Sequence, residues 1–297
     1  MAVALELHNS FVIEEANAGL NINITGYGAG FLEKSVANLV VQVLRSCGKS
    51  IGKGVSGLRI NIENKVPIGV GFGGSAAAVL AGVLASKSIF ESSWSRHETI
   101  DKCLTHESNA AAISASLLGG GSVAVRLDTR VNTTHIDVAP MRICLAAPIF
   151  QSTDDLASAE RIKRSVPADQ DAGLSLYLLE SLRTANYVQL NQIMMAIDYS
   201  TLDSNSGSRF GLVASSAIEA GAALVIPSNF GPGVAAFTES SHEAVCEALK
   251  SGLGKAYGGE VQSWIVPIST YGISLSELNS ISTIDSGSAT VMIERDS

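Results

Sequence analysis

The residues with the clearest chemical potential form a glycine-rich run that leads into an alanine-rich stretch, Gly69-Val70-Gly71-Phe72-Gly73-Gly74-Ser75-Ala76-Ala77-Ala78. Glycines placed before a helix leave backbone N–H groups exposed, and the helix dipole adds positive potential there. Such a nest favours an anion such as a phosphate group, and the Ser75 hydroxyl is suited to contact a metal. The simpler alternative is a close strand-to-helix crossing in which Ser75 only caps the helix.

The segments around this run alternate between strand-like and helix-like hydrophobic spacing. We expect strands at 3–14, 19–25, 58–62 and 122–127, and helices over 32–44, 75–86 and 95–118. Gly48 is the expected stop of the first helix, and Ser95 is the expected cap of the third. The glycine-rich run therefore joins a strand to a helix.

The second half of the chain has helix-like and strand-like segments in mixed order. We expect helices near 171–184, 186–198, 209–221 and 241–252, and strands near 142–150, 222–227, 233–238 and 260–266. The polar stretch 280–297 is expected to fray. This pattern predicts an α+β protein with a first domain at 1–150, which holds the glycine-rich loop, and a second α+β domain at 151–297.

The amino-acid composition indicates which kinds of binding partner to expect. Only 16% of the residues are charged and the formal net charge is -8, so a surface that follows nucleic-acid phosphates is not expected. No apolar run reaches the roughly 20 residues of a membrane span, and we expect a cytoplasmic protein with a small-molecule partner. The scattered cysteines, which predict buried thiols, are Cys47, Cys103, Cys144 and Cys246.

Several motifs occur in the order of a known family. Val66 to Ala78 resembles the pattern Pro, short spacer, Gly-Leu-Gly-Ser-Ser-Ala-Ala of the GHMP kinases, and homoserine kinase is the most similar member. Residues that match further elements of that enzyme are Ala4 to Asn9, Ser35 to Leu39, His106 to Asn109, Leu117 to Gly120, Lys163 to Pro167 and Ser228 to Gly233. The resemblance covers roughly residues 4–265.

This resemblance implies a GHMP-kinase-like fold of two subdomains, an N-terminal part like ribosomal protein S5 and a ferredoxin-like C-terminal part. It implies ATP and Mg²⁺ as cofactors if kinase activity is retained, none otherwise, and it is compatible with a homodimer. The implied nucleotide contacts are Asn38, Gly71, Phe72, Gly73, Gly74, Ser75 and Ala76. The implied catalytic residues are Ser75, Asn109 and His106, with Arg164 and Arg209 as candidate clamps for a substrate carboxylate.

The chain also departs from the family pattern. Leu104 stands where the family has a magnesium-binding Glu, Gly74 replaces the first Ser of the loop, and Asn229-Phe230 replaces a Gly-Ala pair. The family's Pro-x-x-x-Asn-Leu-Gly segment, expected before Ala4, has no counterpart in this sequence. Ser75 remains as a candidate metal ligand, and Glu107 is the residue that could compensate for Leu104.

Two functions are consistent with these matches and departures. The first is homoserine-kinase-like, ATP-dependent phosphorylation of a small hydroxylated metabolite. The alternative is a GHMP fold that has lost phosphoryl transfer and serves metabolite binding or another reaction, such as an isomerisation or a cyclisation. The exchange of polar family positions for Leu104 and Phe230 favours the alternative.

Overall fold

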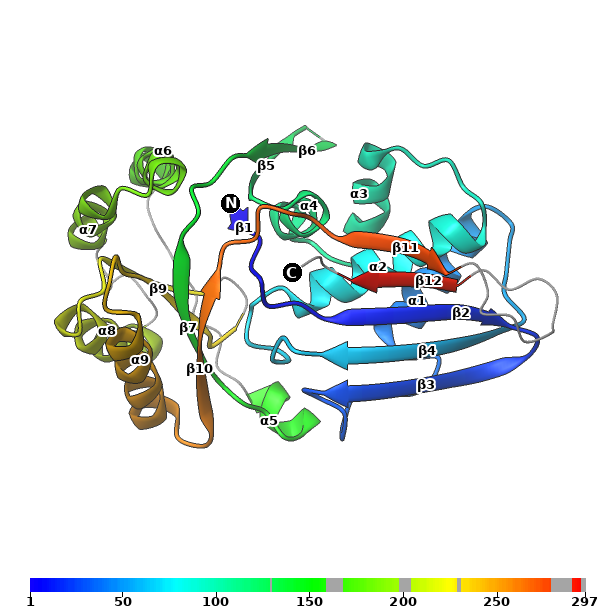
Figure 1. Ribbon diagram of the computed structural model, residues 1–297, viewed down its shortest axis with the longest axis horizontal. Helices are drawn as coiled ribbons and strands as arrows, with labels where there is room; N and C mark the ends of the chain where they lie inside the picture. Colours follow the sequence, from blue (N-terminus) through cyan, green and yellow to red (C-terminus); the bar gives the residue numbers. More distant parts are fainter. Residues whose placement is uncertain (129, 159–167, 198–203, 229–230, 279–289, 295–297) are drawn as a thin grey trace. The chain divides into compact units, whose positions relative to one another are not determined.

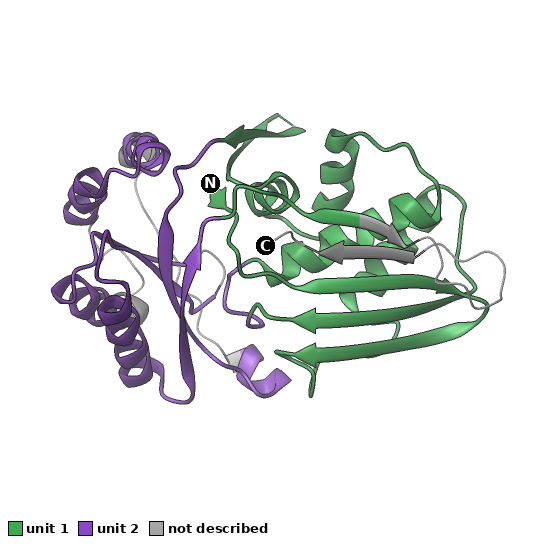
Figure 2. Cartoon of the chain, viewed as in Figure 1, with its two compact units in different colours: residues 1–66, 73–136, 269–297 green, residues 67–72, 137–268 purple. Residues whose placement is uncertain are grey.

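The computed structural model describes residues 1–128, 130–158, 168–197, 204–228, 231–278 and 290–294. These residues group into two units, shown in Figure 2. Unit 1 comprises residues 1–66, 73–136 and 269–297, and unit 2 comprises residues 67–72 and 137–268. The two domains predicted from the sequence, at 1–150 and 151–297, stay a prediction.

Unit 1 is built on a five-stranded sheet with the order β11-β12-β2-β4-β3, in which only β3 and β4 are parallel. Its strands are β2 (Ser10–Ala16), β3 (Gly19–Gly26), β4 (Gly57–Asn64), β11 (Ser274–Leu278) and β12 (Thr290–Glu294). A smaller sheet has the order β1-β5-β6. Its strands are β1 (Ala2–Val3), β5 (Gly121–Leu127) and β6 (Arg130–Ile136).

Four helices complete unit 1, and two of them cover one face of the five-stranded sheet (Figure 1). They are α1 (Leu39–Ser50), α2 (Gly74–Ile89), α3 (Arg96–Leu104) and α4 (Ala110–Leu118). Alternate side chains of β2 and β4, such as Phe11 and Ile60, are buried against α1 and α2. A Cβ at Gly82 would lie 2.8 Å from the Cβ of Val43, so glycine lets α1 and α2 approach closely.

Unit 2 contains a four-stranded antiparallel sheet with the order β10-β7-β9-β8. Its strands are β7 (Arg142–Pro148), β8 (Leu224–Pro227), β9 (Val234–Phe237) and β10 (Val261–Pro267). Its helices are α5 (Thr153–Ser158), α6 (Ala168–Thr184), α7 (Tyr187–Ala196), α8 (Ser204–Glu219) and α9 (His242–Tyr257). The mixed helix and sheet content confirms the predicted α+β class, and the expected helices and strands of this half are present with shifts of a few residues.

Four expectations in unit 1 are wrong. The strand expected over 3–14 is interrupted, because β1 ends at Val3 and β2 begins only at Ser10. The first helix does not begin at Leu32 but at Leu39, because Asn38 caps it, and it continues past Gly48 to Ser50. The helix expected over 95–118 is two helices, because α3 ends at Leu104 and Asn109 caps a new helix, α4. Part of the tail that was expected to fray forms β12, whose backbone pairs with β2.

All four cysteines are free and buried, as predicted. Within the described part of the chain, no helix has the length and apolar character needed to cross a membrane.

Candidate functional site

The N-terminus of α2 differs from the other helix starts of unit 1. The side chains of Asn38, Ser95 and Asn109 accept hydrogen bonds at the starts of α1, α3 and α4. Helix α2 has Gly73 at the N-cap, with a left-handed φ of 89°, no side-chain cap and no acidic residue in its first turn. Its first backbone N–H groups therefore lack the usual capping oxygen, which leaves room for an external anion.

Space is also available at this helix start. A Cβ added to Gly73 would meet nothing within 4 Å, and Ser75 is exposed. The alternative in which Ser75 caps α2 is wrong, because Gly73 is the N-cap and Ser75 is the second residue of the helix. The Ser75 hydroxyl is thus not used in holding its own helix.

Ser75 instead bonds to a carboxylate from the break between α3 and α4. Its Oγ donates a hydrogen bond to Oε2 of Glu107 at 2.7 Å. The other oxygen of this carboxylate, Oε1, accepts the backbone N–H of Asn109 at 3.0 Å. The break between α3 and α4 therefore brings Glu107 to the start of α2.

The oxygen atoms of Ser75 and Glu107 suit a magnesium ion that is shared with a bound phosphate. They suit a metal held by protein ligands alone less well. Mg²⁺ prefers oxygen ligands and is usually bound by one or two carboxylates together with substrate phosphates and water. Ser75 and Glu107 supply a hydroxyl and a carboxylate side by side. Among the residues that the structure describes, no group of three or more His, Cys, Asp or Glu side chains could hold a metal. Phosphate oxygens would have to complete the ligand set.

Two further candidates lie in or beside the same break. Oδ1 of Asn109 accepts the backbone N–H of Ala112 at 3.1 Å, so this side chain caps α4 through its oxygen. The expectation of an Asn within a continuous helix is therefore wrong. Nε2 of His106 is buried and has no hydrogen-bond partner among the described residues. The acid or base role of His106 stays a prediction.

Leu104 and Asn38 have mainly structural surroundings. Leu104, at the position of the family's Glu, packs against the hydrophobic core of unit 1. Asn38 is 8% exposed, its Oδ1 accepts the N–H of Val40 at 3.0 Å, and its Nδ2 donates to the carbonyl of Glu33 at 2.8 Å. A nucleotide contact by Asn38 stays a prediction, and its amide group already has these two partners.

Within unit 2, residues 67–72 lie against the second glycine-rich motif that the sequence singled out. Oγ of Ser228 is 2.8 Å from the carbonyl oxygens of both Val70 and Gly231. The N–H of Gly233 donates to the carbonyl of Val70 at 3.0 Å. A Cβ at Gly71, whose φ is 88°, would lie 2.4 Å from Oγ of Ser228. Glycine is therefore required there by both conformation and space. Asn229 and Phe230 lie outside the described residues.

Phe72 anchors the end of this segment through its ring. The rings of Phe72 and Trp264 meet edge to face, with centroids 6.3 Å apart and planes at 88°. A Cβ at Gly233 would lie 2.6 Å from the Phe72 ring, so the ring covers the glycine backbone directly. The aromatic residue in place of the family's Leu therefore has a packing role within unit 2.

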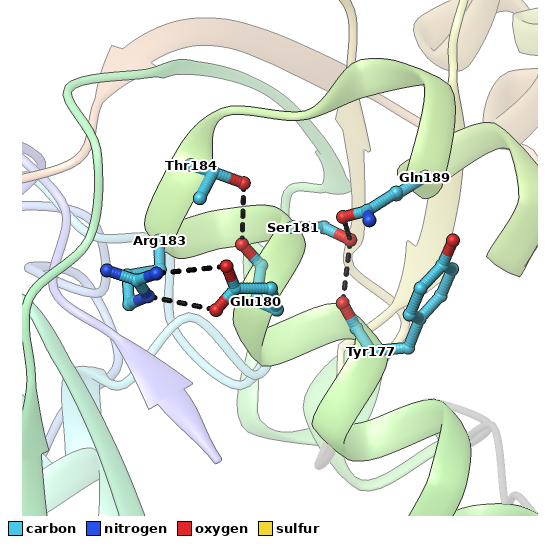
Figure 3. Close-up of polar contacts among 6 residues, drawn as sticks. All are labelled: Tyr177, Glu180, Ser181, Arg183, Thr184 and Gln189. Atoms are coloured by element: carbon cyan, nitrogen blue, oxygen red, sulfur yellow. Dashed lines mark hydrogen bonds and ion pairs between the residues drawn. The ribbon is translucent and has the colours of Figure 1, made fainter.

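Of the two arginines that could bind the substrate, the structure describes only Arg209. Arg164 lies outside the described residues. Arg209 is exposed on α8, with its guanidinium 5.8 Å from the centre of the Tyr257 ring. Arg183 on α6 is held instead by Glu180, with two hydrogen bonds of 2.9 Å (Figure 3), and this contact lowers the pKa of the Glu180 carboxyl. A substrate contact by Arg209 or Arg164 stays a prediction.

Sequence reasoning did not assign a role to Asn9 or to Ser228. Asn9 is 7% exposed, and its Oδ1 accepts the N–H groups of Lys65 and Val66 at 3.0 and 2.9 Å. These bonds fix the chain just before the glycine-rich run. Both residues stand in motifs that match the family, but the partners of Asn9 are 56 and 57 positions away and Val70 is 158 positions from Ser228, which no local pattern reveals.

The comparison with protein families identifies the region that contains these features. Residues 38–120 match the family described as GHMP kinases N terminal domain. This range contains α1 to α4, and with them Asn38, Gly73, Ser75, Glu107 and Asn109.

Curated relatives and solved structures agree with this match. The chain is 27% identical to the homoserine kinase of Petrotoga mobilis over 197 residues, which covers 65% of this chain and 64% of that protein. It is 27% identical to the homoserine kinase of Caldicellulosiruptor bescii over 259 residues, which covers 85% of this chain and 83% of the relative. The first match thus spans less than two thirds of the relative's length.

The solved structure of the homoserine kinase from Cytophaga hutchinsonii superposes with a TM-score of 0.64 at 20% identity, covering 91% of this chain and 89% of that structure. This likeness confirms the predicted two-subdomain GHMP fold. Residues 38–120 thus match the GHMP kinases N terminal domain, and homoserine kinases are among the proteins to which this chain is similar.

Proposed function

We propose that this chain transfers a phosphoryl group from ATP to a hydroxyl group of a small metabolite, and that the ATP phosphates bind at the start of α2. One observation carries the proposal. The helix begins at a left-handed glycine without a side-chain cap, and its exposed Ser75 is bonded to the Glu107 carboxylate. The homoserine kinases among the relatives support an amino alcohol of the homoserine type as the acceptor.

The backbone N–H groups of Gly74, Ser75 and Ala76 would bind the phosphate oxygens in this proposal. Contacts of Gly71 and Phe72 with ATP stay a prediction from the sequence. Ser75 Oγ and Glu107 would hold Mg²⁺, which neutralises phosphate charge when it is bound. Glu107 thereby supplies the carboxylate that Leu104 does not.

Acceptor positioning is proposed for Asn109. Its Oδ1 is used in capping α4, whereas the structure gives no partner for its Nδ2 among the described residues, so Nδ2 would donate to the acceptor hydroxyl. Catalysis would then rest mainly on positioning and on stabilisation of charge, because phosphoryl transfer needs little covalent chemistry from the protein.

The second candidate function is a retained GHMP fold without phosphoryl transfer. The apolar packing of Leu104 favours it, because that position cannot bind a metal. The two candidates differ in one requirement: only the first needs the Glu107 carboxylate to act on bound MgATP.

Calorimetric titration with MgATP, followed by an ADP-release assay on homoserine and related amino alcohols, tests the proposal. We expect binding and turnover, and we expect Ser75→Ala to lower turnover about tenfold or more. Ser95→Ala is the matched control, since Ser95 also bonds to a glutamate at 2.7 Å but lies at the start of α3. Absence of MgATP binding to the unaltered chain would overturn the proposal, and binding without ADP release would support the second candidate.

A further inference from the structure

Two cysteines of unit 2 come together from distant parts of the sequence. Cys144 lies in β7 and Cys246 in α9, and α9 packs against β7 and β10. Cys144 is fully buried and Cys246 is 6% exposed. Neither residue belongs to the site at the start of α2, so a role for this pair is independent of the proposed function.

The hydrogen-bond partners of the two sulfur atoms show that both lie in the layer between α9 and the sheet, near neighbouring residue pairs of β7 and β10. Sγ of Cys144 donates to the carbonyl of His242, the first residue of α9, at 3.3 Å. Sγ of Cys246 donates to the carbonyl of Trp264 in β10 at 3.3 Å. Trp264 directly precedes Ile265, which is the cross-strand partner of Cys144. The Cys144 sulfur thus points from β7 toward α9, and the Cys246 sulfur points from α9 toward the sheet.

The two thiols also influence each other. Each is the largest single influence on the acidity of the other. This mutual influence lowers the pKa of the Cys246 thiol and raises the pKa of the Cys144 thiol. Because the thiolate is the reactive form of cysteine, Cys246 is the better nucleophile of the pair.

The other two cysteines provide an internal contrast. Cys47 in α1 and Cys103 in α3 are buried in the core of unit 1. Burial raises the pKa of Cys47, and it raises the pKa of Cys103 to about 12. Ser86 and Lys102 lower the pKa of Cys47, and Cys47 itself raises the pKa of Cys103, but burial is the largest influence on both thiols. Neither is activated in the way that Cys246 is.

We propose that Cys144 and Cys246 are a modification site that forms a reversible disulfide with hydrogen peroxide as the oxidant, joining β7 to α9. The Cys246 thiolate attacks one peroxide oxygen, the O–O bond breaks, and hydroxide leaves and becomes water. The sulfur of Cys144 then attacks the sulfenic acid on Cys246, the S–O bond breaks, and a second water carries away the Cys144 proton. The two sulfurs lose two electrons in total, and the peroxide gains them.

The test treats the full chain with hydrogen peroxide, blocks the remaining thiols with iodoacetamide, and maps the peptides by mass spectrometry. We expect the loss of two hydrogen atoms from the intact mass and a linked peptide pair that contains Cys144 and Cys246. Dithiothreitol should restore all four free thiols. A peroxide-treated chain should also unfold at a higher temperature than the reduced chain, because the bond closes a long loop.

Variants separate this pair from the buried cysteines of unit 1. Cys246→Ser should abolish the loss of two hydrogens, whereas Cys103→Ser should leave it unchanged. If a variant fails to fold, peptide mapping of the unaltered chain still shows which cysteines are linked. A disulfide mapped to Cys47 and Cys103, sulfinic acid on a single cysteine, or four unreacted thiols in the folded chain would each overturn it.

Discussion

The starts of α2 and α3 use opposite means to begin a helix. Helix α3 has a complete capping box, in which Ser95 Oγ accepts the N–H of Glu98 and the Glu98 carboxylate accepts the N–H of Ser95. Helix α2 begins at Gly73 without a side-chain cap. Both starts include a Ser–Glu hydrogen bond of 2.7 Å, but at α3 it closes the helix end and at α2 it joins two segments. One helix start is satisfied internally, and the other is left able to bind an anion.

The largest expected effect comes from giving α2 a negative charge of its own. Gly73→Asp would place a carboxylate where we propose the ATP phosphates, and the like charges repel. We expect the MgATP affinity, measured by calorimetry, to fall about 100-fold or more. Gly73→Asn is the matched control, because it tests the same left-handed backbone without the charge and should cost much less affinity. Equal losses in both variants would speak against an anion at α2.

The glycines before α2 should matter next, through stability. Gly71→Ala combines a left-handed φ of 88° with a Cβ placed 2.4 Å from Oγ of Ser228. We expect a loss of about 2–3 kcal/mol in the free energy of unfolding, measured with urea. Gly52→Ala has a φ of 69° but an open Cβ position, so it reports the strain alone and should lose about 1 kcal/mol. Equal losses would remove the argument for the close contact with Ser228.

The capping box of α3 should contribute to stability but not to binding. Ser95→Ala removes the side-chain oxygen from the helix start, and we expect a loss of about 1 kcal/mol in the free energy of unfolding. Ser75→Ala should change stability by less than about 0.5 kcal/mol, because Ser75 does not cap its helix. The contrast between the two helix starts fails if Ser75→Ala destabilises the chain as much as Ser95→Ala does in urea unfolding.

The smallest expected effect is a dependence on pH at α3. The hydrogen bond from the Ser95 backbone N–H, helped by the Ser95 hydroxyl, lowers the pKa of the Glu98 carboxyl. A carboxyl whose pKa is lower in the folded state contributes stability above its unfolded pKa and loses it as the pH falls through the folded pKa. The stability difference between the unaltered chain and Glu98→Gln should therefore shrink from about pH 7 to about pH 3. A constant difference in urea unfolding across that range would contradict this assignment.

The sequence predicted most elements of the fold, because β4 alternates regularly between apolar and polar residues and α2 is a long stretch rich in Ala, Leu and Val. It missed the break between α3 and α4, because apolar residues with helical spacing lie on both sides of it, at Ile100 and Cys103 and again at Ala110 and Ile113. The side chains that decide the matter are the polar groups of Glu107 and Asn109, which bond to backbone and to Ser75. Strand β12 was missed because its stability comes from pairing with β2, which lies at the other end of the chain.

The candidate site was predictable only in part. The spacing of glycines before Ser75 indicated an anion site, and the structure adds that the helix lacks a cap. That Glu107 would meet Ser75, 32 positions earlier, could not be derived from local pattern because it depends on where α3 ends. The bond between Ser228 and Val70 has the same cause, since it joins segments 158 positions apart.

The most direct test of the central claim compares Glu107→Gln with Glu98→Gln in the MgATP-dependent release of ADP. Each variant removes the charge from one of the two glutamates that bond to a serine at 2.7 Å. We expect Glu107→Gln to lower turnover about 100-fold and to raise the Mg²⁺ concentration needed, with Glu98→Gln within about twofold of the unaltered chain. Turnover that is unchanged in Glu107→Gln, or reduced equally in both variants, would contradict the assignment of Glu107 to the phosphate and metal site.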